Sequence, residues 1–292
     1  MAGTAFGQGN VTSKNQLAGQ RNVITTAVPF LTITPDSRSA GMGDAGVARD
    51  ADANSGHWNI SSMAFIQKKA GLSLNAAPWL RQLVPDVWFY DLAGYTKVGR
   101  SNKSVVSASI RYFSLGEIQF TDDFANPNGN ANPYEMAVDL GYATQLSENL
   151  SVGGAMRVVN SCLTCGATGT VGTTFKPGRA AAGDLGMYYK KPIKIGGKEG
   201  KFAFGATITN IGNKITYSTS AEKDFIPTSL RLGTSIKAVI DDHNELSFNF
   251  DINKLLVPTY PVYYKSASGA DSIDANGDKV IQYGKDSKNV PV

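Results

Sequence analysis

The side chains that could support chemistry are few and widely separated in this chain. Its two cysteines, Cys162 and Cys165, form a C-x-x-C pair, and its two histidines, His57 and His243, lie far from them in the sequence. A zinc site needs a second pair of ligands, and a thioredoxin-type site needs a helix N-terminus to activate its first cysteine. We therefore expect a local disulfide between Cys162 and Cys165, with metal binding as the less favoured alternative.

Three glycines, Gly41, Gly43 and Gly46, have the G-x-G-x-x-G spacing. A dinucleotide site needs this loop directly after a buried strand, within a strand–helix–strand unit. Here residues 35–40 separate the glycines from the apolar stretch at 30–33, and long amphipathic strands follow instead of such units. We expect these glycines to permit close backbone packing rather than to bind a nucleotide.

No catalytic arrangement is visible in the sequence. It contains no G-x-S-x-G motif, and two histidines leave little scope for a Ser–His or Cys–His pair. Residues 274–278 resemble part of a calcium loop but lack its full spacing and its distal glutamate. We therefore expect a protein that is not an enzyme and that needs neither a cofactor nor a metal.

The composition is low in charge, with 18% charged residues and a formal net charge of +4. Basic residues are scattered rather than clustered with aromatic ones, so nucleic acid is not an expected partner. No run of about 18 apolar residues is present, which argues against a transmembrane helix. The composition is still compatible with a membrane β-barrel, because polar residues facing the lumen offset apolar residues facing lipid.

Nine segments show the period-two alternation of β-strands, in which successive side chains take opposite faces. In residues 133–146, for example, Val138 and Leu140 share one face, whereas Ala137 and Asp139 share the other. The predicted strands are residues 71–80, 86–98, 103–113, 133–146, 149–160, 179–190, 201–211, 226–238 and 244–255.

Six ionisable residues fall on the less apolar face of these strands. In a barrel this face encloses the lumen, where such groups line a wet channel or form ion pairs. We favour pairing within the barrel over a role in selectivity. The six residues are Arg111, Asp139, Arg157, Asp184, Arg231 and Asp251.

The connections between the predicted strands are short and long by turns. The long ones, at 114–132, 161–178, 212–225 and 256–292, would lie together at one end of an up-and-down sheet. Outer-membrane barrels have this arrangement, with short periplasmic turns and long extracellular loops. Aromatic residues that fit the girdles of such barrels are Trp88, Tyr90, Tyr112, Tyr134, Tyr142, Tyr188, Tyr189 and Phe202. We predict an all-β, transmembrane, antiparallel up-and-down β-barrel in the bacterial outer membrane, with a soluble exported β-sandwich as the alternative.

Three regions follow from this reading. Residues 1–28 form a flexible tail, whose small residues favour a trimmed signal peptide. Residues 29–70 form a short, partly helical, plug-like segment, with Ser61 to Lys69 as its better helix. Residues 71–292 form the barrel, which we expect to be incomplete because nine is an odd number of strands and the last stretch is polar.

Two N-terminal blocks resemble a known family. Residues 30–47 closely resemble the opening of the PorV family, which are outer-membrane proteins of the type IX secretion system of Bacteroidetes. Residues 57–65, which include Trp58 and Asn59, resemble the W-N-P-A-G-L-A segment of the wider FadL-like barrel family. They depart from that pattern at residues 60–62.

This resemblance, over about residues 25–260, implies a fourteen-stranded barrel with the N-terminal segment inside or beneath it. Trp58 and Asn59 are then candidate plug residues. The resemblance also implies a non-enzymatic protein that binds secreted cargo through the cargo's C-terminal domain at the extracellular side. Such a protein takes cargo from the large translocon barrel and delivers it to the cell-surface attachment complex, which includes a sortase-like protein.

Contacts with these partners are expected on the long loops. Phe120 and Phe124 are candidate apolar anchors, since buried aromatic side chains dominate interface energetics. The equally weighted alternative is that both rings fold back onto the barrel rim. The lipid bilayer is a further expected partner, and lipopolysaccharide is a candidate one. The alternative function is a FadL-like channel for small hydrophobic molecules, which the polar inner face opposes.

Overall fold

The computed structural model describes residues 24–121, 124–165, 176–217, 223–241, 243–258, 262–264, 270–274, 277 and 279–283. These residues fall in two compact units, Ala27–Leu256 and a smaller unit made of Met1–Thr26 with Val257–Pro291. Most of the predicted tail at 1–28 lies outside the described residues. The predicted boundaries after residues 28 and 70 remain predictions.

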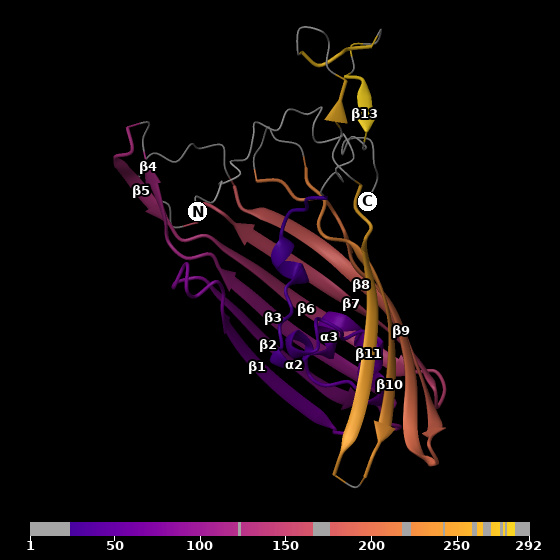
Figure 1. Cartoon of the computed structure of the whole chain (residues 1–292). Helices are drawn as coiled ribbons and strands as arrows, with labels where there is room; N and C mark the ends of the chain where they lie inside the picture. The colour runs from indigo at the N-terminus through magenta and orange to yellow at the C-terminus, as the bar shows by residue number, and fades with distance from the viewer. Residues whose placement is uncertain are drawn as a thin grey trace, which may run out of the picture. The chain divides into compact units, whose positions relative to one another are not determined.

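The larger unit is built on one antiparallel sheet of nine strands (Figure 1). Every strand pairs with the next strand of the sheet along the chain, so the predicted up-and-down order and all nine predicted strands are confirmed. The strands, in sheet order, are β1 (Ala70–Pro78), β2 (Trp88–Val98), β3 (Ser104–Ser114), β6 (Tyr134–Gln145), β7 (Leu150–Cys162), β8 (Gly178–Ile195), β9 (Lys198–Gly212), β10 (Ser229–Val239) and β11 (Glu245–Leu255).

Two connections differ from the prediction. The predicted loop at 114–132 contains a small hairpin of β4 (Ile118–Thr121) and β5 (Pro127–Ala131). The predicted turn at 191–200 is mostly strand, because β8 and β9 stay paired as far as Ile195 and Lys198. Gly196 and Gly197 make the turn there, and their φ angles of 58° and 82° are ones that glycine adopts without strain.

The two faces of the sheet differ as the alternation predicts. On the outer face large apolar side chains are exposed, such as Leu140 at 62% and Met156 at 78%. On the inner, concave face Ala137, Ala143 and Val159 are buried. These small side chains leave room for the N-terminal segment, residues 27–66, which lies in the concavity of the sheet in Figure 1.

The prediction that Tyr188 belongs to an aromatic girdle is wrong. It pairs with Ser151 across the ladder, and its side chain is 2% exposed on the inner face. Strand alternation then turns Tyr189 outward. Position near a strand end was therefore not enough to identify a girdle residue, because the residue's parity decides which face it takes.

The N-terminal segment contains four short helical turns, η1 (Pro29–Thr32), α2 (Ser37–Gly41), α3 (Ser55–Trp58) and η2 (Ile60–Phe65). The predicted helix from Ser61 to Lys69 is wrong in type and extent, since η2 is a 3₁₀ helix that ends at Phe65. Asn59 caps the start of this helix, because its side chain accepts a hydrogen bond from the Ser61 N–H at 3.1 Å. At its end the N–H of Ile66 donates to the carbonyl oxygen of Met63 at 3.1 Å, the i to i+3 spacing of a 3₁₀ turn.

No helix in the described part of the chain is long and apolar enough to cross a membrane. The smaller unit, taken by itself, contains a two-stranded ladder of β12 (Val262–Tyr263) and β13 (Ile281–Tyr283). An ion pair of 2.9 Å joins Lys279 to Asp271 beside it.

Candidate functional site

Asn59 fastens the N-terminal segment to the inner face of the sheet. Its amide nitrogen donates to the carbonyl oxygens of Val47 at 3.1 Å and Met187 in β8 at 2.9 Å. Gly186 and Gly205 leave the space for this side chain, because a Cβ at either position would lie less than 3.0 Å from an atom of Asn59. Asn59 therefore joins two turns of the N-terminal segment to the middle of the sheet.

Trp58 is the second anchor and is also buried. Its Nε1 lies 3.4 Å from the carboxylate of Asp36, and the guanidinium of Arg231 lies 5.1 Å from its ring. A Cβ at Gly46 would lie within 3.0 Å of the indole ring, so the ring needs a glycine opposite it. Trp58 thus packs between the glycine-rich stretch and a cation of β10.

The structure places different demands on the three glycines of the G-x-G-x-x-G stretch. Close packing is confirmed for Gly46, which faces Trp58. Gly43 has a φ angle of 71°, which favours glycine in an open position. A Cβ at Gly41 would meet nothing within 4 Å, so close packing is wrong for that position.

Four ionisable side chains of the inner face form a buried chain of ion pairs. Arg111 lies 2.9 Å from Asp139, Asp139 also pairs with Arg157, and Arg157 lies 2.9 Å from Asp184. The predicted pairing is confirmed for these four residues. Buried charges need such partners, and these ion pairs link four neighbouring strands, β3, β6, β7 and β8.

Arg231 and Asp251 do not join that chain of ion pairs. Asp251, in β11, accepts hydrogen bonds from the N–H groups of Gly46 at 2.7 Å and Val47 at 2.9 Å. Arg231 stacks against Trp58 instead. Both inward-facing charges therefore hold the N-terminal segment rather than each other.

Asn210 completes the chain of ion pairs from β9. Its φ angle of 58° lies in the left-handed region, which asparagine tolerates better than most residues. Its N–H donates to Asp184 at 2.7 Å, and its side-chain oxygen accepts a hydrogen bond from Arg157. The strand pairing is irregular opposite it, between Gly183 and Leu185, so a bulge aims this side chain at the ions.

His57 lies beside this network without a catalytic partner in the described residues. The ring is partly buried, with Nε2 fully enclosed, and Nδ1 lies 3.1 Å from the Arg111 guanidinium. Burial, together with the positive charges of Arg111 and Arg231, holds the pKa of His57 well below its usual 6.5. The neutral ring accepts a hydrogen bond from Arg111.

A pocket of about 550 Å³ opens at the end of the sheet where the long connections lie. Phe30 and Ile33 of the N-terminal segment line it, as do Trp79, just after β1, and Phe113 of β3. The Trp79 and Phe113 rings meet edge to face with centroids 6.1 Å apart. This pocket presents an apolar surface at the long-loop end.

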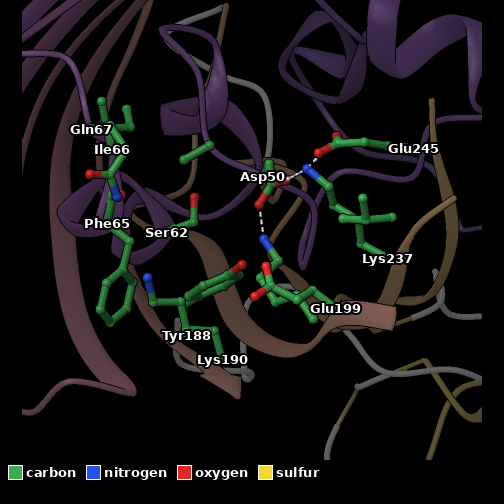
Figure 2. Close-up of a pocket in the computed structure, with 14 residues that line it drawn as sticks. Asp50, Ser62, Phe65, Ile66, Gln67, Tyr188, Lys190, Glu199, Lys237 and Glu245 are labelled. Carbon is green, nitrogen blue, oxygen red and sulfur yellow. Dashed lines mark hydrogen bonds and ion pairs between the residues drawn. The ribbon is translucent and has the colours of Figure 1, made fainter. Parts of the chain in front are cut away.

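A second pocket, of about 410 Å³, opens at the opposite end, where the strands meet in short turns (Figure 2). Asp50 of the N-terminal segment pairs there with Lys201 of β9 and, at 3.3 Å, with Lys237 of β10. Lys237 also lies 2.5 Å from Glu245. Lys190 lies 4.1 Å from the centre of the Phe65 ring. We call this pocket the short-turn mouth.

The sequence matches the family described as type IX secretion system protein PorV over residues 16–262. This match covers well over half of the chain. The chain belongs to the PorV family. A comparison with curated proteins gave no match. PorV is a secretion-system family and not a known enzyme family, and in the described residues no cluster of three His, Cys, Asp or Glu side chains could hold a metal ion.

Both blocks that carry the resemblance to the PorV family, 30–47 and 57–65, contribute side chains that pack into the sheet. Phe30 and Val47 are buried, as are Trp58 and Asn59. The roles of Trp58 and Asn59 as a plug remain predictions, but both side chains have the burial and contacts of anchors.

The loop residues predicted from the sequence lie on separate elements of the structure. Phe120 is in β4 and half-buried, whereas Phe124 is 87% exposed. Cys162 and Cys165 form a disulfide at the end of β7, and the carbonyl oxygen of Cys165 accepts a hydrogen bond from the N–H of Asn132 at 2.8 Å. The use of the two phenylalanines as cargo anchors remains a prediction.

The short-turn mouth was not predicted from the sequence. A signal for it was present, because Lys190, Lys201 and Lys237 each stand at an inward-facing position near the end of a strand. The three lysines are far apart in the sequence, so their clustering could not be predicted from it. The curvature of the sheet brings them together.

Proposed function

We propose that this chain is an integral outer-membrane component of the type IX secretion system that binds secreted cargo at its long-loop end. It binds the cargo's C-terminal domain, takes the cargo from the large translocon barrel, and passes it to the attachment complex that includes a sortase-like protein. Membership of the PorV family is the observation that carries this proposal. The up-and-down topology supports it, because it brings the long connections to one end.

The outer face of the sheet supports a place in the membrane. Exposed apolar side chains alternate with inward-facing charges, as in the strands of outer-membrane barrels. Trp88 stacks on Tyr90 with centroids 5.9 Å apart, and Tyr112 stacks on Tyr134 at 5.4 Å. These aromatic pairs lie at the long-loop ends of β2, β3 and β6, where a lipid interface would place a girdle.

A FadL-like channel for small hydrophobic molecules is less well supported. The inner face carries the buried pairs of Arg111 and Asp139 and of Arg157 and Asp184. The N-terminal segment lies across that face and is hydrogen-bonded to it through Asn59. These features suit a filled scaffold better than an apolar conduit.

The proposal can be tested by recovering tagged protein from detergent-solubilised outer membranes. We expect cargo and a large barrel protein in the eluate of the unmodified chain. Phe124→Ser should reduce cargo recovery by about fivefold or more, because it removes an exposed aromatic ring from the long-loop end. It should leave the recovery of the large barrel protein unchanged.

The matched control is Leu146→Ser, which removes an exposed apolar side chain at the short-turn end. It should leave cargo recovery unchanged. Equal loss of cargo with both variants would contradict the assignment of cargo binding to the long-loop end. Recovery of neither cargo nor a large barrel protein with the unmodified chain would overturn the proposal as a whole.

A further inference from the structure

The outer face of the sheet is hollowed over its central strands. Gly154 in β7 and Gly183 in β8 take outward positions there and carry no side chain. In the ladder Gly154 is paired with Leu185 and Met156 with Gly183, so the two glycines are diagonal neighbours. They form the floor of an apolar groove of about 630 Å³, which we call the glycine groove. Its lining side chains are those of Val106, Leu140, Tyr142, Met156, Leu185 and Ile211.

Packing within the sheet accounts for only one of the two glycines. A Cβ at Gly154 would lie 3.1 Å from the carbonyl oxygen of Asp184, which is a tight contact. A Cβ at Gly183 would meet the carbonyl oxygen of Ala155 at 3.5 Å, which is an ordinary contact. A side chain at position 183 would therefore fit the sheet and fill the groove. The sheet does not require this glycine, whereas an occupant of the groove would.

Hydroxyl groups border the glycine groove on the side of the short turns. Tyr142 lines the groove, and its hydroxyl donates to Ser104 Oγ at 3.0 Å. Ser104 Oγ in turn lies 2.9 Å from Thr144 Oγ1. These residues share the outward parity of Leu140, and the step from Leu140 to Thr144 along β6 is about 13 Å. Over this distance the outer face changes from apolar to hydroxyl-bearing.

Positive charge follows the hydroxyl groups. Residues 92–110, which contain the turn from β2 to β3, have three basic residues and no acidic one. Two of the three, Arg100 and Lys103, are exposed in the turn that leads into Ser104. The next turn along the sheet adds a single acid, Glu148, so basic residues outnumber acidic ones at this border.

We propose that the glycine groove binds one glycerophospholipid with an anionic headgroup. An acyl chain lies over Gly154 and Gly183, and the phosphate lies at the turn that carries Arg100 and Lys103. The order along the strands is apolar groove, hydroxyl groups and cations, which matches the order of acyl chain, ester groups and phosphate in such a lipid. Cationic side chains close to a membrane surface attract anionic lipids.

This inference rests on the proposed place of the chain in the outer membrane, which puts the outer face against lipid. Other occupants match the surface less well. An uncharged acyl chain would leave the cations of the β2–β3 turn without a partner. An apolar segment of another protein would leave both the hydroxyl groups and the cations unused. The glycine groove lies on the opposite face of the sheet from the N-terminal segment and does not include the long connections.

The test uses the purified full chain in detergent and native mass spectrometry. Phosphatidylglycerol or phosphatidylethanolamine with the same acyl chains is added, and the lipid retained is measured as the collision energy is raised. We expect one phosphatidylglycerol molecule to be retained, about fivefold more than phosphatidylethanolamine. The preference should weaken as salt is raised, because exposed charges are screened.

Gly183→Phe tests the groove. The added ring fills it and should lower the retention of phosphatidylglycerol about fivefold or more. The matched control is Ala181→Phe, which places the same ring at the next outward position of β8, outside the groove. It should change retention less than twofold. Gly183→Leu is a milder filling variant, for which we expect an intermediate loss and an unchanged unfolding midpoint.

A double variant tests the headgroup. Arg100→Gln with Lys103→Gln should bring the retention of phosphatidylglycerol down to that of phosphatidylethanolamine. The control, Lys176→Gln with Lys254→Gln, removes the same charge from exposed residues at the long-loop end and should keep the preference.

Three results would overturn the inference. Equal losses with Gly183→Phe and Ala181→Phe would mean that lipid covers the whole outer face without using the groove. Equal retention of the two lipids by the unmodified chain would mean that the headgroup is not recognised. A copurifying protein, and no lipid, that is lost with Gly183→Phe would make the groove a protein-docking surface.

The cargo experiment separates this inference from the proposed function. A chain that is absent from detergent-solubilised outer membranes contradicts the proposed function. A chain that is recovered there with cargo, but shows no lipid preference, contradicts only the lipid site. Gly183→Phe should leave the recovery of cargo unchanged.

Discussion

The carboxylate of Asp251 accepts a hydrogen bond of 2.7 Å from the backbone N–H of Gly46, which lies 205 residues earlier in the chain. A second hydrogen bond, of 2.9 Å, comes from the N–H of Val47. The ninth strand of the sheet therefore holds the same turn that Trp58 covers from the other side. The attachment of the last strand of this sheet to the N-terminal segment therefore rests on contacts between the two ends of the larger unit.

Asp251→Ala should weaken this attachment. Two N–H groups lose a charged acceptor in a partly buried place, and hydrogen bonds to charged groups contribute about 1.5–3 kcal/mol each at most. We expect the free energy of unfolding to fall by about 2–3 kcal/mol, measured by urea unfolding in detergent. Asp241→Ala, in an exposed turn, is the control and should have a smaller effect. Equal effects would mean that Asp251 does not hold the N-terminal segment.

Gly46 and Gly41, which belong to the same glycine-rich stretch, allow a matched comparison of packing. Gly46→Ala places a methyl group within 3.0 Å of the Trp58 ring and should destabilise the chain by about 1–3 kcal/mol, as overpacking does. Gly41→Ala adds the same methyl group at the end of α2, where nothing lies within 4 Å. It should be neutral or stabilising by up to about 1 kcal/mol. Thermal unfolding of both variants checks this, and an equal loss would contradict it.

The left-handed conformation of Asn210 predicts an order among its variants. Asn210→Ala and Asn210→Gly both remove the hydrogen bond with Arg157. Only alanine is also strained by the positive φ angle at this position. We expect the alanine variant to be less stable than the glycine variant by about 1 kcal/mol. Unfolding midpoints of the two variants measure the difference. A more stable alanine variant would show that the backbone is not held left-handed.

His57 makes stability depend on pH. Its pKa is lowered in the folded chain, so the unfolded chain binds a proton first as the pH falls below about 6.5. The stability contributed by the neutral ring is present above that pH and is lost as the pH falls toward the folded pKa. The loss should approach about 1.4 kcal/mol per pH unit.

Urea unfolding at pH 7, 6 and 5 measures this dependence. His57→Asn should flatten it, whereas His243→Asn, in an exposed turn, should leave it unchanged. A slope that survives His57→Asn would assign the dependence to other groups.

Local alternation was sufficient to predict the nine strands and the inward position of Arg111, Asp139, Arg157 and Asp184, because the side-chain period of a strand depends on its own residues. It failed where another residue decided the outcome. The turn at 60–65 is a short 3₁₀ helix capped by Asn59, whose side chain also bonds Met187 of a distant strand. Tyr188 was assigned by its place near a strand end, although its parity, the same as that of Asp184, puts it on the inner face.

The sequence alone therefore established an all-β chain with an apolar face, a charged face and long connections at one end. The folded sheet selected the partner of each charge: Asp251 with Gly46, Asp50 with Lys201 and Lys237, Arg157 with two aspartates and Asn210. It also gathered the lysines of the short-turn mouth. These choices are not local, because they follow from the curvature that brings distant strands and the N-terminal segment within hydrogen-bonding distance.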